Sequence, residues 1–124
     1  MPAVSVIIPN YNHAPFLKER IDSVLNQTFQ DFEVCILDDC SRDNSREIME
    51  TYRPHPRVTH LIYNEVNSGS AFIQWQKGIA LAKSEYVWIA ESDDRSDESF
   101  LKKAVEAMEL NLNASLFFCQ SNCI

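Results

Sequence analysis

The chain has 124 residues, of which 45% are apolar, and its 18 acidic and 11 basic side chains give a formal net charge of -7 at pH 7. This length and apolar content suit one domain with a single core and exclude a disordered chain. The acidic balance argues against a nucleic acid as partner, because such proteins need a basic face to displace counterions.

Signals for targeting and for cysteine chemistry are weak. The chain start MPAVSVIIPN lacks a signal-peptide pattern, and no apolar run approaches the ~20 residues that cross a bilayer. We therefore expect a cytoplasmic protein without a transmembrane segment, with the inner face of the membrane as the alternative for a longer parent. The four cysteines have no CxxC spacing, so neither a structural zinc nor a disulfide is expected, and Cys35 is predicted to be a small buried side chain.

Strands and helices are predicted to alternate along the chain. Apolar or β-branched runs predict strands at 4–8, 32–37, 58–63, 86–90 and 114–119. Apolar spacing of three and four residues predicts helices at 16–27, from 44 or 45 to 52, at 70–82 and at 97–111. This alternation is typical of βαβ units, so we expect a three-layer α/β/α fold with a mainly parallel sheet.

Two of the predicted helices carry specific expectations. In the helix at 70–82, Phe72 and Ile79 recur at helical spacing and form its apolar face with Trp75 and Ala82, although Gly78 interrupts it at a cost of about 1 kcal/mol. The helix at 97–111 is expected to be capped by Ser96 or Asp97. Its inward side chains are predicted to be Leu101, Val105, Met108 and Leu112. Trp75 and Trp88 are both predicted to be core residues.

Polar residues follow the end of each predicted strand. They are Asn10, Tyr11 and Asn12; Asp38, Asp39 and Ser41; Asn64, Asn67 and Gly69; and Glu91, Asp93 and Asp94. Ligands of parallel sheets bind outside the carboxyl ends of the strands, so these clusters are expected to meet at one crevice. The chain has only two glycines and no GxGxxG pattern, which argues against a dinucleotide or P-loop cradle.

The stretch YVWIAESDD places three acids directly after an apolar strand. Such clustering raises carboxylate pKa values unless a positive charge lies among the acids. A divalent cation shared with phosphate oxygens would supply that charge. A solvated turn and the start of a helix are the alternatives, and His13 nearby is expected to be an exposed loop residue.

Three stretches together resemble the nucleotide-binding part of the family 2 glycosyltransferases. They are SVIIPNYN, FEVCILDDCSRDNS and NSGSAFIQWQKGIALAKSEYVWIAESDD, and the resemblance extends over essentially the whole chain in order and spacing. It implies a GT-A fold, which is a Rossmann-like, nucleotide-diphospho-sugar transferase fold. It also implies an inverting transferase that moves a sugar from a UDP- or dTDP-linked donor to a hydroxyl acceptor. The acceptor would be a carbohydrate or lipid-linked molecule, in the biosynthesis of bacterial surface polysaccharide.

By position, the resemblance assigns roles to particular residues. Tyr11 would stack on a uracil or thymine base, and Asp39 would bind the base or ribose. The nucleotide-binding residues implied in this way are Pro9, Asn10, Tyr11, Asp38, Asp39, Ser41, Lys77 and Asp93. The cluster that corresponds to the DxD motif would hold Mg²⁺ or Mn²⁺ through Asp93, Asp94 and Glu91. The metal would stabilise the leaving nucleoside diphosphate.

The sequence departs from the family pattern at three places. Cys40 replaces a usual glycine, Glu91 replaces the first aspartate of the triplet, and QWQKG replaces an A-R-N stretch whose arginine has only Lys77 as a substitute. The family's general base lies well downstream of the acid cluster, whereas this chain ends 30 residues after Asp94 at Ile124. We therefore interpret residues 1–124 as a truncated N-terminal, nucleotide-sugar-binding part without the acceptor-binding half or the base.

Two alternatives belong to other functional classes. One is a non-catalytic module that binds a nucleotide sugar, which would share the donor site. The other is a phosphoacceptor signalling domain, which also places acids and Mg²⁺ at strand ends. That fold requires a lysine beyond its fifth strand, where this chain has Gln120, Ser121, Asn122 and Cys123.

Overall fold

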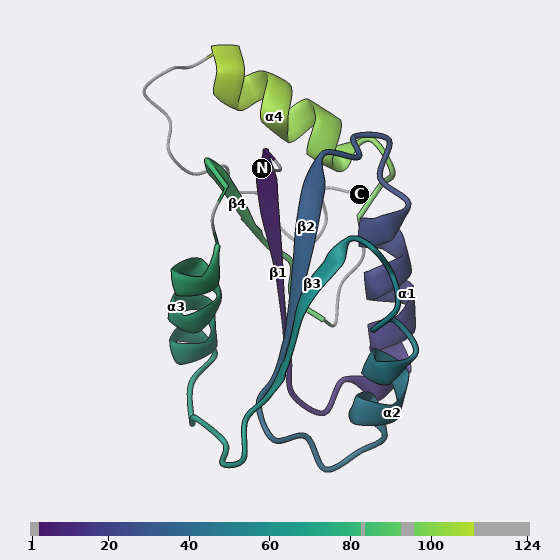
Figure 1. Cartoon of the computed structure of the whole chain (residues 1–124), viewed down its shortest axis with the longest axis vertical. Coiled ribbons are helices and arrows are strands. Elements are labelled where there is room, and N and C mark those ends of the chain that lie inside the picture. Colours follow the sequence, from purple (N-terminus) through teal and green to yellow (C-terminus); the bar gives the residue numbers. More distant parts are fainter. Residues whose placement is uncertain (1–2, 83, 93–95, 111–124) are drawn as a thin grey trace.

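The computed structural model describes residues 3–82, 84–92 and 96–110, and within the last helix the side chains of Met108 and Leu110 lie outside this description. Helices lie on both faces of a twisted parallel sheet, with α1 and α2 on one side and α3 on the other (Figure 1). This arrangement is the predicted three-layer α/β/α architecture. The strands are β1 (Val4–Asn10), β2 (Phe32–Asp38), β3 (Val58–Tyr63) and β4 (Tyr86–Ile89), and the helices are α1 (Ala14–Leu25), α2 (Ser45–Glu50), α3 (Ala71–Leu81) and α4 (Phe100–Leu110).

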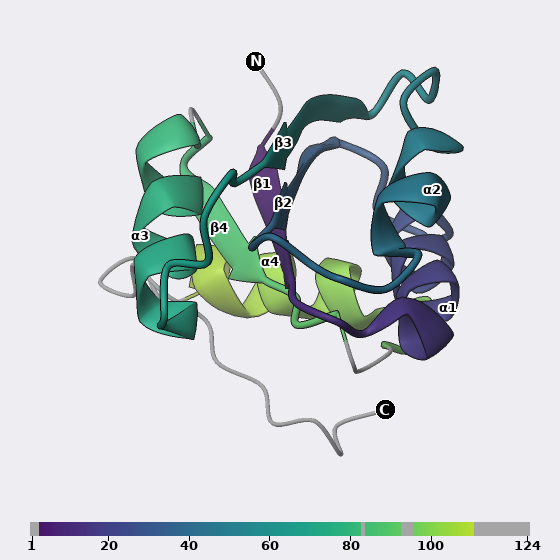
Figure 2. The same cartoon turned by 90° about the horizontal axis from the view of Figure 1, so that it is seen from below.

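The sheet has four strands in the order β3-β2-β1-β4. All three pairings are parallel, and β1 and β2 run in register from the Val4–Phe32 pair to the Asn10–Asp38 pair. The chain moves outward from β1 to β3 and then crosses to the other side of β1 to form β4. The gap between the ends of β1 and β4 is therefore a topological switch point, where open parallel sheets bind ligands. Figure 2 views the molecule from the end at which the strands finish.

Both faces of the central strands are buried, which explains why their sequences are continuous apolar runs rather than alternating ones. All seven residues of β1 and all seven of β2 are buried. On one face, Val6 and Ile8 pack with Leu17 and Ile21 of α1. On the other face, Ile7 packs with a smaller apolar group made up of Cys35, Leu37, Ile62, Leu81, Val87 and Ile89. The predicted burial of Cys35 is confirmed.

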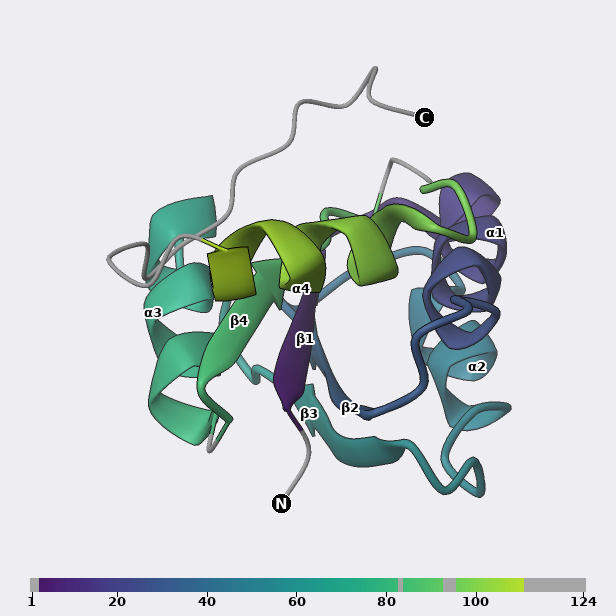
Figure 3. The same ribbon diagram turned by 90° about the horizontal axis from the view of Figure 1, so that it is seen from above.

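Helix α4 begins at Phe100, three residues later than predicted, and packs beside the starts of β1 and β4 (Figure 3). The buried side chain of Gln27 holds its first turn, because Oε1 accepts a hydrogen bond from the Leu101 amide at 2.8 Å and Nε2 donates to the Asp97 carbonyl at 2.7 Å. The Asp97 carbonyl also accepts a hydrogen bond from the Phe100 amide at 3.0 Å, so it is shared between Gln27 and the first residue of α4. The predicted cap at Ser96 or Asp97 is wrong, whereas the burial of Leu101 and Val105 is confirmed.

The expected apolar face of α3 is also wrong in part. Phe72 and Ile79 are 60% and 52% exposed, and the buried residues of this helix are Gln74 and Gly78. A Cβ atom at position 78 would lie 2.3 Å from Cγ2 of Ile7, so only glycine lets α3 approach β1 this closely. Close packing at one glycine, and not the spacing of large apolar residues, decides which face of α3 meets the sheet.

The remaining boundaries agree with the prediction to within a few residues. Helix α1 starts two residues early, with Pro15 in its first turn, where the missing amide hydrogen has no cost. Trp88 packs against the core with its ring centroid 4.7 Å from that of Phe100. The fifth strand predicted at 114–119 lies outside the described residues. No helix among those described is long and apolar enough to span a bilayer.

Candidate functional site

A cavity of about 290 Å³ opens where the parallel strands end. Residues that follow all four strands contribute to it, as the parallel topology predicts. Its lining consists of Pro9, Asn10, Tyr11, His13, Asp39, Asn67, Gly69, Ser70, Ala71, Gln74 and Glu91. Of the residues that the sequence assigns to a nucleotide or metal site, Pro9, Asn10, Tyr11, Asp39 and Glu91 line this cavity.

Asp39 is the acid that the loop after β3 surrounds with hydrogen-bond donors. Its Oδ1 accepts from the Ser68 amide and from Asn64 Nδ2, each at 2.8 Å, and its Oδ2 accepts from Ser68 Oγ at 2.7 Å. Burial raises the pKa of Asp39, but the hydrogen bonds from Ser68 and Asn64, with the charge of Lys77, outweigh burial and hold it below its ordinary value. Asp39 therefore presents a fixed, ionised acceptor to the cavity at neutral pH.

Asp38 lies behind the cavity wall and organises the loops after β1 and β2. Its Oδ1 accepts from Asn10 Nδ2 at 2.9 Å and from Ser41 Oγ at 2.5 Å, and its Oδ2 accepts from the Ser41 amide at 2.9 Å. Ser41 Oγ in turn accepts from the Asn12 amide at 2.9 Å. Asp38 and Ser41 are not among the cavity-lining residues, so in this structure they act on the cavity through Asn10.

The backbone conformation at Cys40 explains why the family pattern has a glycine at this position. Its φ of 63° lies in the left-handed region, which side chains with a Cβ atom rarely adopt. The tight turn between Asp39 and Ser41 is thus retained here at the cost of backbone strain.

Glu91 joins the cavity to two other elements. Its Oε1 accepts a hydrogen bond from Trp75 Nε1 of α3 at 2.8 Å, and its backbone carbonyl accepts from Arg20 Nε of α1 at 2.8 Å. Arg20, which is only 3% exposed, also donates through Nη1 to Ser96 Oγ at 2.8 Å. Arg20 therefore holds the chain on both sides of residues 93–95. Asp93 and Asp94 themselves lie outside the described residues.

Lys77 is placed beside the cavity and is not part of its lining. Its ammonium donates to Oδ1 of Asn64, and the amide of Asn64 donates to Asp39 and also to Gln74 Oε1 at 2.9 Å. Lys77 thus orients the Asn64 side chain so that its amide nitrogen faces Asp39. The carboxylate nearest to Lys77 in this network is that of Asp39, and the Asn64 side chain lies between the two charges.

Among the described residues, two buried polar side-chain atoms have no hydrogen-bond partner: Asn10 Oδ1 and Gln74 Nε2. Both residues line the cavity, so one acceptor and one donor beside it are unmatched. Buried polar groups are seldom left unpaired, which points to a polar ligand or a bound water at this place.

Sequence reasoning missed the roles of Arg20, His13 and Trp75. The sequence predicts an exposed loop residue at His13, whereas in the structure it lines the cavity and its Nδ1 lies 2.8 Å from Ser92 Oγ. The sequence predicts a core position for Trp75, yet its side chain is only half-buried and donates to Glu91. An arginine between Leu17 and Ile21 on the buried face of a predicted helix was the one available signal for Arg20.

Comparison with known proteins adds a family-level finding. A family model described as "Glycosyl transferase family 2" matches residues 5–120. TuaG of Bacillus subtilis, a glycosyltransferase named for teichuronic acid biosynthesis, is 37% identical over 107 residues, which is 86% of this chain and 42% of TuaG.

Two solved structures share the fold. TarS 1–349 of S. aureus in complex with UDP matches with a TM-score of 0.78 and 31% identity over 88% of this chain and 32% of that one. The mannosyltransferase PcManGT from Pyrobaculum calidifontis, in complex with GDP-Man and Mn²⁺, matches with a TM-score of 0.76 and 26% identity over 86% of this chain and 32% of that one. The chain therefore spans less than half of the length of these proteins.

Proposed function

Because this chain belongs to glycosyl transferase family 2 and has the GT-A fold, we propose that it is the nucleotide-sugar-binding part of an inverting glycosyltransferase. The enzyme would transfer a sugar from a UDP- or dTDP-linked donor to a hydroxyl acceptor. The observation that carries this proposal is the cavity at the β1/β4 switch point, into which Asp39 presents an ionised carboxylate. The family match also favours this proposal over the phosphoacceptor alternative.

The nucleoside would lie between Tyr11 and Asp39. The Tyr11 ring is 43% exposed at the cavity edge and is available to stack on a pyrimidine base. Asp39 can only accept hydrogen bonds, so its partner must offer a donor, such as the ring N–H of uracil or thymine or a ribose hydroxyl. The unmatched oxygen of Asn10 and nitrogen of Gln74 would add one acceptor and one donor to the same ligand.

The diphosphate would be held through a divalent metal. A carboxylate from Glu91 already lines the cavity, and oxygen ligands of this kind suit Mg²⁺ or Mn²⁺. We propose Glu91, Asp93 and Asp94 as the residues that hold the ion. When bound, such an ion neutralises charge that develops on the leaving nucleoside diphosphate. The presence of Mn²⁺ with GDP-Man in PcManGT supports the use of a divalent metal.

The indole of Trp75 and the guanidinium of Arg20 would preorganise this acid cluster. Trp75 fixes the Glu91 carboxylate and Arg20 fixes its backbone, so Glu91 would meet the ion without a large loss of side-chain entropy. His13 would hold the neighbouring Ser92.

We propose that the acceptor-binding half of the enzyme and its general base lie outside residues 1–124. An inverting transfer needs a base to take the proton of the acceptor hydroxyl. The chain spans 42% of TuaG and 32% of the TarS structure, so most of each relative has no counterpart in it. We propose that the acceptor is a carbohydrate or lipid-linked precursor of a bacterial surface polymer, by analogy with the names of these relatives. The reaction is proposed to take place in the cytoplasm or at the inner face of the membrane.

Calorimetry against UDP, dTDP, GDP and CMP, each with Mn²⁺ and with EDTA, tests the donor site. We expect one pyrimidine diphosphate to bind in the presence of Mn²⁺ and to lose most of its affinity with EDTA. If none of the four nucleotides binds measurably, or if all four bind alike, the proposal is contradicted. In a full-length protein, nucleotide-sugar binding without any transfer to acceptors would favour the non-catalytic module instead.

A further inference from the structure

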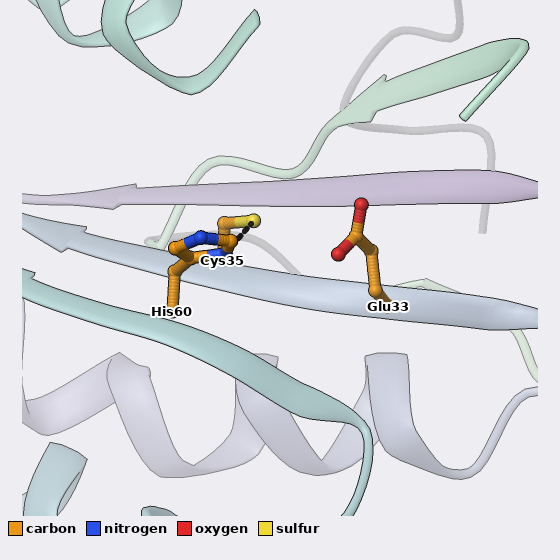
Figure 4. A group of neighbouring side chains, drawn as sticks. All are labelled: Glu33, Cys35 and His60. Atoms are coloured by element: carbon orange, nitrogen blue, oxygen red, sulfur yellow. Dashed lines mark hydrogen bonds between the residues drawn. The ribbon is translucent and has the colours of Figure 1, made fainter. Parts of the chain in front are cut away.

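A second group of chemically reactive side chains lies on the sheet itself, away from the cavity. Glu33 and Cys35 of β2 and His60 of β3 project from the same face of neighbouring strands (Figure 4). Cys35 Sγ lies 3.4 Å from His60 Nδ1, and one ligand atom from each of the three residues lies within 4.8 Å of the other two. None of the three residues lines the cavity at the strand ends.

An irregularity in the strand pairing brings these residues together. The register between β2 and β3 shifts between Val34, which pairs with Val58, and Cys35, which pairs with His60. The extra residue, Thr59, is accommodated by this β-bulge, and bulges commonly redirect a side chain toward a functional position. If the pairing continued without the bulge, Thr59 and not His60 would stand opposite Cys35.

The carboxylate of Glu33 is oriented by hydroxyl groups. Its Oε2 accepts from Ser5 Oγ at 2.5 Å and its Oε1 accepts from Thr59 Oγ1 at 2.9 Å. Outer hydrogen bonds of this type fix carboxylate ligands in metal sites. Glu33 is 7% exposed, Cys35 is fully buried and His60 is half-buried, so the group is approached from the side of the imidazole.

We propose that Glu33, Cys35 and His60 bind a transition-metal dication of the Zn²⁺ class. Bonds of about 2.3 Å to sulfur and about 2.0–2.1 Å to nitrogen at a tetrahedral angle separate the two ligand atoms by roughly 3.5 Å, which is close to the 3.4 Å between Cys35 and His60. The Glu33 carboxylate would be the third protein ligand, with one of its oxygens exchanging a hydroxyl partner for the metal. The fourth position is left for water on the partly exposed side of His60.

The ligand types select the metal. Sulfur and imidazole nitrogen favour Zn²⁺ and Co²⁺ over Mg²⁺ and Mn²⁺, which prefer oxygen ligands. On binding, the Cys35 thiol releases its proton to solvent and the resulting thiolate bonds to the metal. The site would therefore take a different ion from the acid cluster at the strand ends and does not depend on the proposed function.

The spacing of these residues explains why the sequence did not indicate the site. Glu33 and Cys35 are separated by one residue and His60 lies 25 positions after Cys35, which matches no zinc pattern. Only the pairing of β2 with β3 makes them neighbours.

Co²⁺ binding to the triple variant Cys40→Ala, Cys119→Ala, Cys123→Ala tests the proposal, because Cys35 is then the only thiol. We expect a thiolate-to-cobalt charge-transfer band that saturates at one Co²⁺ per chain, and that Zn²⁺ but not excess Mg²⁺ abolishes. Adding His60→Ala to this background should weaken Co²⁺ binding by at least about tenfold. A folded triple variant that gives no such band would overturn the proposal.

A second measurement uses the natural cysteines and covers the case in which the triple variant does not fold. Zn²⁺ should raise the melting temperature of the unmodified chain, because a ligand that binds the folded state stabilises it. The variant His60→Ala should lose this increase. The matched control His55→Ala replaces another half-buried histidine, whose Nδ1 accepts from the Arg57 amide, and should keep the increase. An equal increase in His60→Ala and in the unmodified chain would also overturn the proposal.

Discussion

The indole nitrogen of Trp75 donates a hydrogen bond to the carboxylate of Glu91 at 2.8 Å and so ties helix α3 to the segment that follows β4. Glu91 is one methylene longer than the aspartate that the family pattern has at this position, and Trp75 lies in the QWQKG stretch that replaces A-R-N. The two departures from the family pattern are therefore in contact. In this chain the acid at the first position of the triplet is held by an aromatic donor.

Replacing Trp75 by Phe tests whether this contact matters for the donor site. The variant keeps an aromatic ring in α3 but removes the N–H donor together with part of the ring volume. We expect the affinity for the nucleotide with Mn²⁺ to fall about threefold to tenfold, which corresponds to the loss of one hydrogen bond. Calorimetry measures it, with Tyr52→Phe as the control, because this change also removes a hydrogen-bond donor from an aromatic side chain, but one that donates to Asp22 and does not line the cavity. An unchanged affinity in Trp75→Phe would leave the indole with a packing role only.

Asp39→Asn is predicted to weaken nucleotide binding by about tenfold or more, with or without metal. The change removes a charged acceptor, and charge-assisted hydrogen bonds contribute about 1.5–3 kcal/mol. It also places an amide opposite the donors of Asn64 and Ser68. The exposed Asp31→Asn serves as the control for net charge, and equal affinities in the two variants would remove Asp39 from the nucleotide site.

Acid should destabilise the fold through carboxylates that the structure holds ionised. Burial raises the pKa of Asp39 and of Asp43, but hydrogen bonds from Ser68 and Asn64 to the first, and from Ser45 and Ala14 to the second, leave both pKa values below the ordinary one. A carboxylate with a lowered pKa in the folded state stabilises the fold at pH values above its unfolded pKa. This stabilisation is lost as the pH falls through the folded pKa.

Urea unfolding at about pH 6 and about pH 3 measures this loss. The unmodified chain should be less stable at the lower pH. Asp39→Asn, whose amide does not titrate in this range, should lose less of its stability between the two pH values. The same loss in both proteins would mean that Asp39 is not held ionised in the fold.

Much of the fold could be predicted because its sheet is parallel and covered on both faces. Continuous apolar runs such as those at 4–8 and 32–37 have few alternatives, and the polar residues after them reach the same edge whatever the details of packing. For this reason the sequence alone predicts that Tyr11, Asp39 and Glu91 meet at one crevice, and all three line the same cavity. Strands and helices can be predicted from the sequence where their apolar pattern matches the side chains that the fold buries.

The contacts that support the site depend on residues far apart in the chain. Arg20 and Glu91 are 71 positions apart, and Gln27 holds the start of α4 from 74 positions away. A local sequence pattern does not indicate which buried polar side chain will form a hydrogen bond with which distant backbone group. The orientation of α3 failed for a related reason, since one glycine against Ile7 outweighs the apolar spacing of Phe72 and Ile79.

The close approach of Gly78 to Ile7 predicts that Gly78→Ala destabilises the fold, although helix propensity alone would predict that it stabilises α3. In an isolated helix, Ala in place of Gly is favourable by about 1 kcal/mol. Here the added Cβ atom would lie 2.3 Å from Ile7 Cγ2, so α3 must move away from β1. We expect Gly78→Ala to lower the free energy of unfolding by about 1–3 kcal/mol, the usual range for overpacking.

Urea denaturation of Gly78→Ala measures the change, and Gln76→Ala on the exposed face of the same helix is the control. The control should stay within about 0.5 kcal/mol of the unmodified chain, as exposed substitutions usually do. Because Gly69, Ser70 and Gln74 of the cavity wall are carried by α3 or precede it, Gly78→Ala should weaken nucleotide binding as well. A more stable Gly78→Ala protein would mean that α3 does not pack on β1 through this glycine.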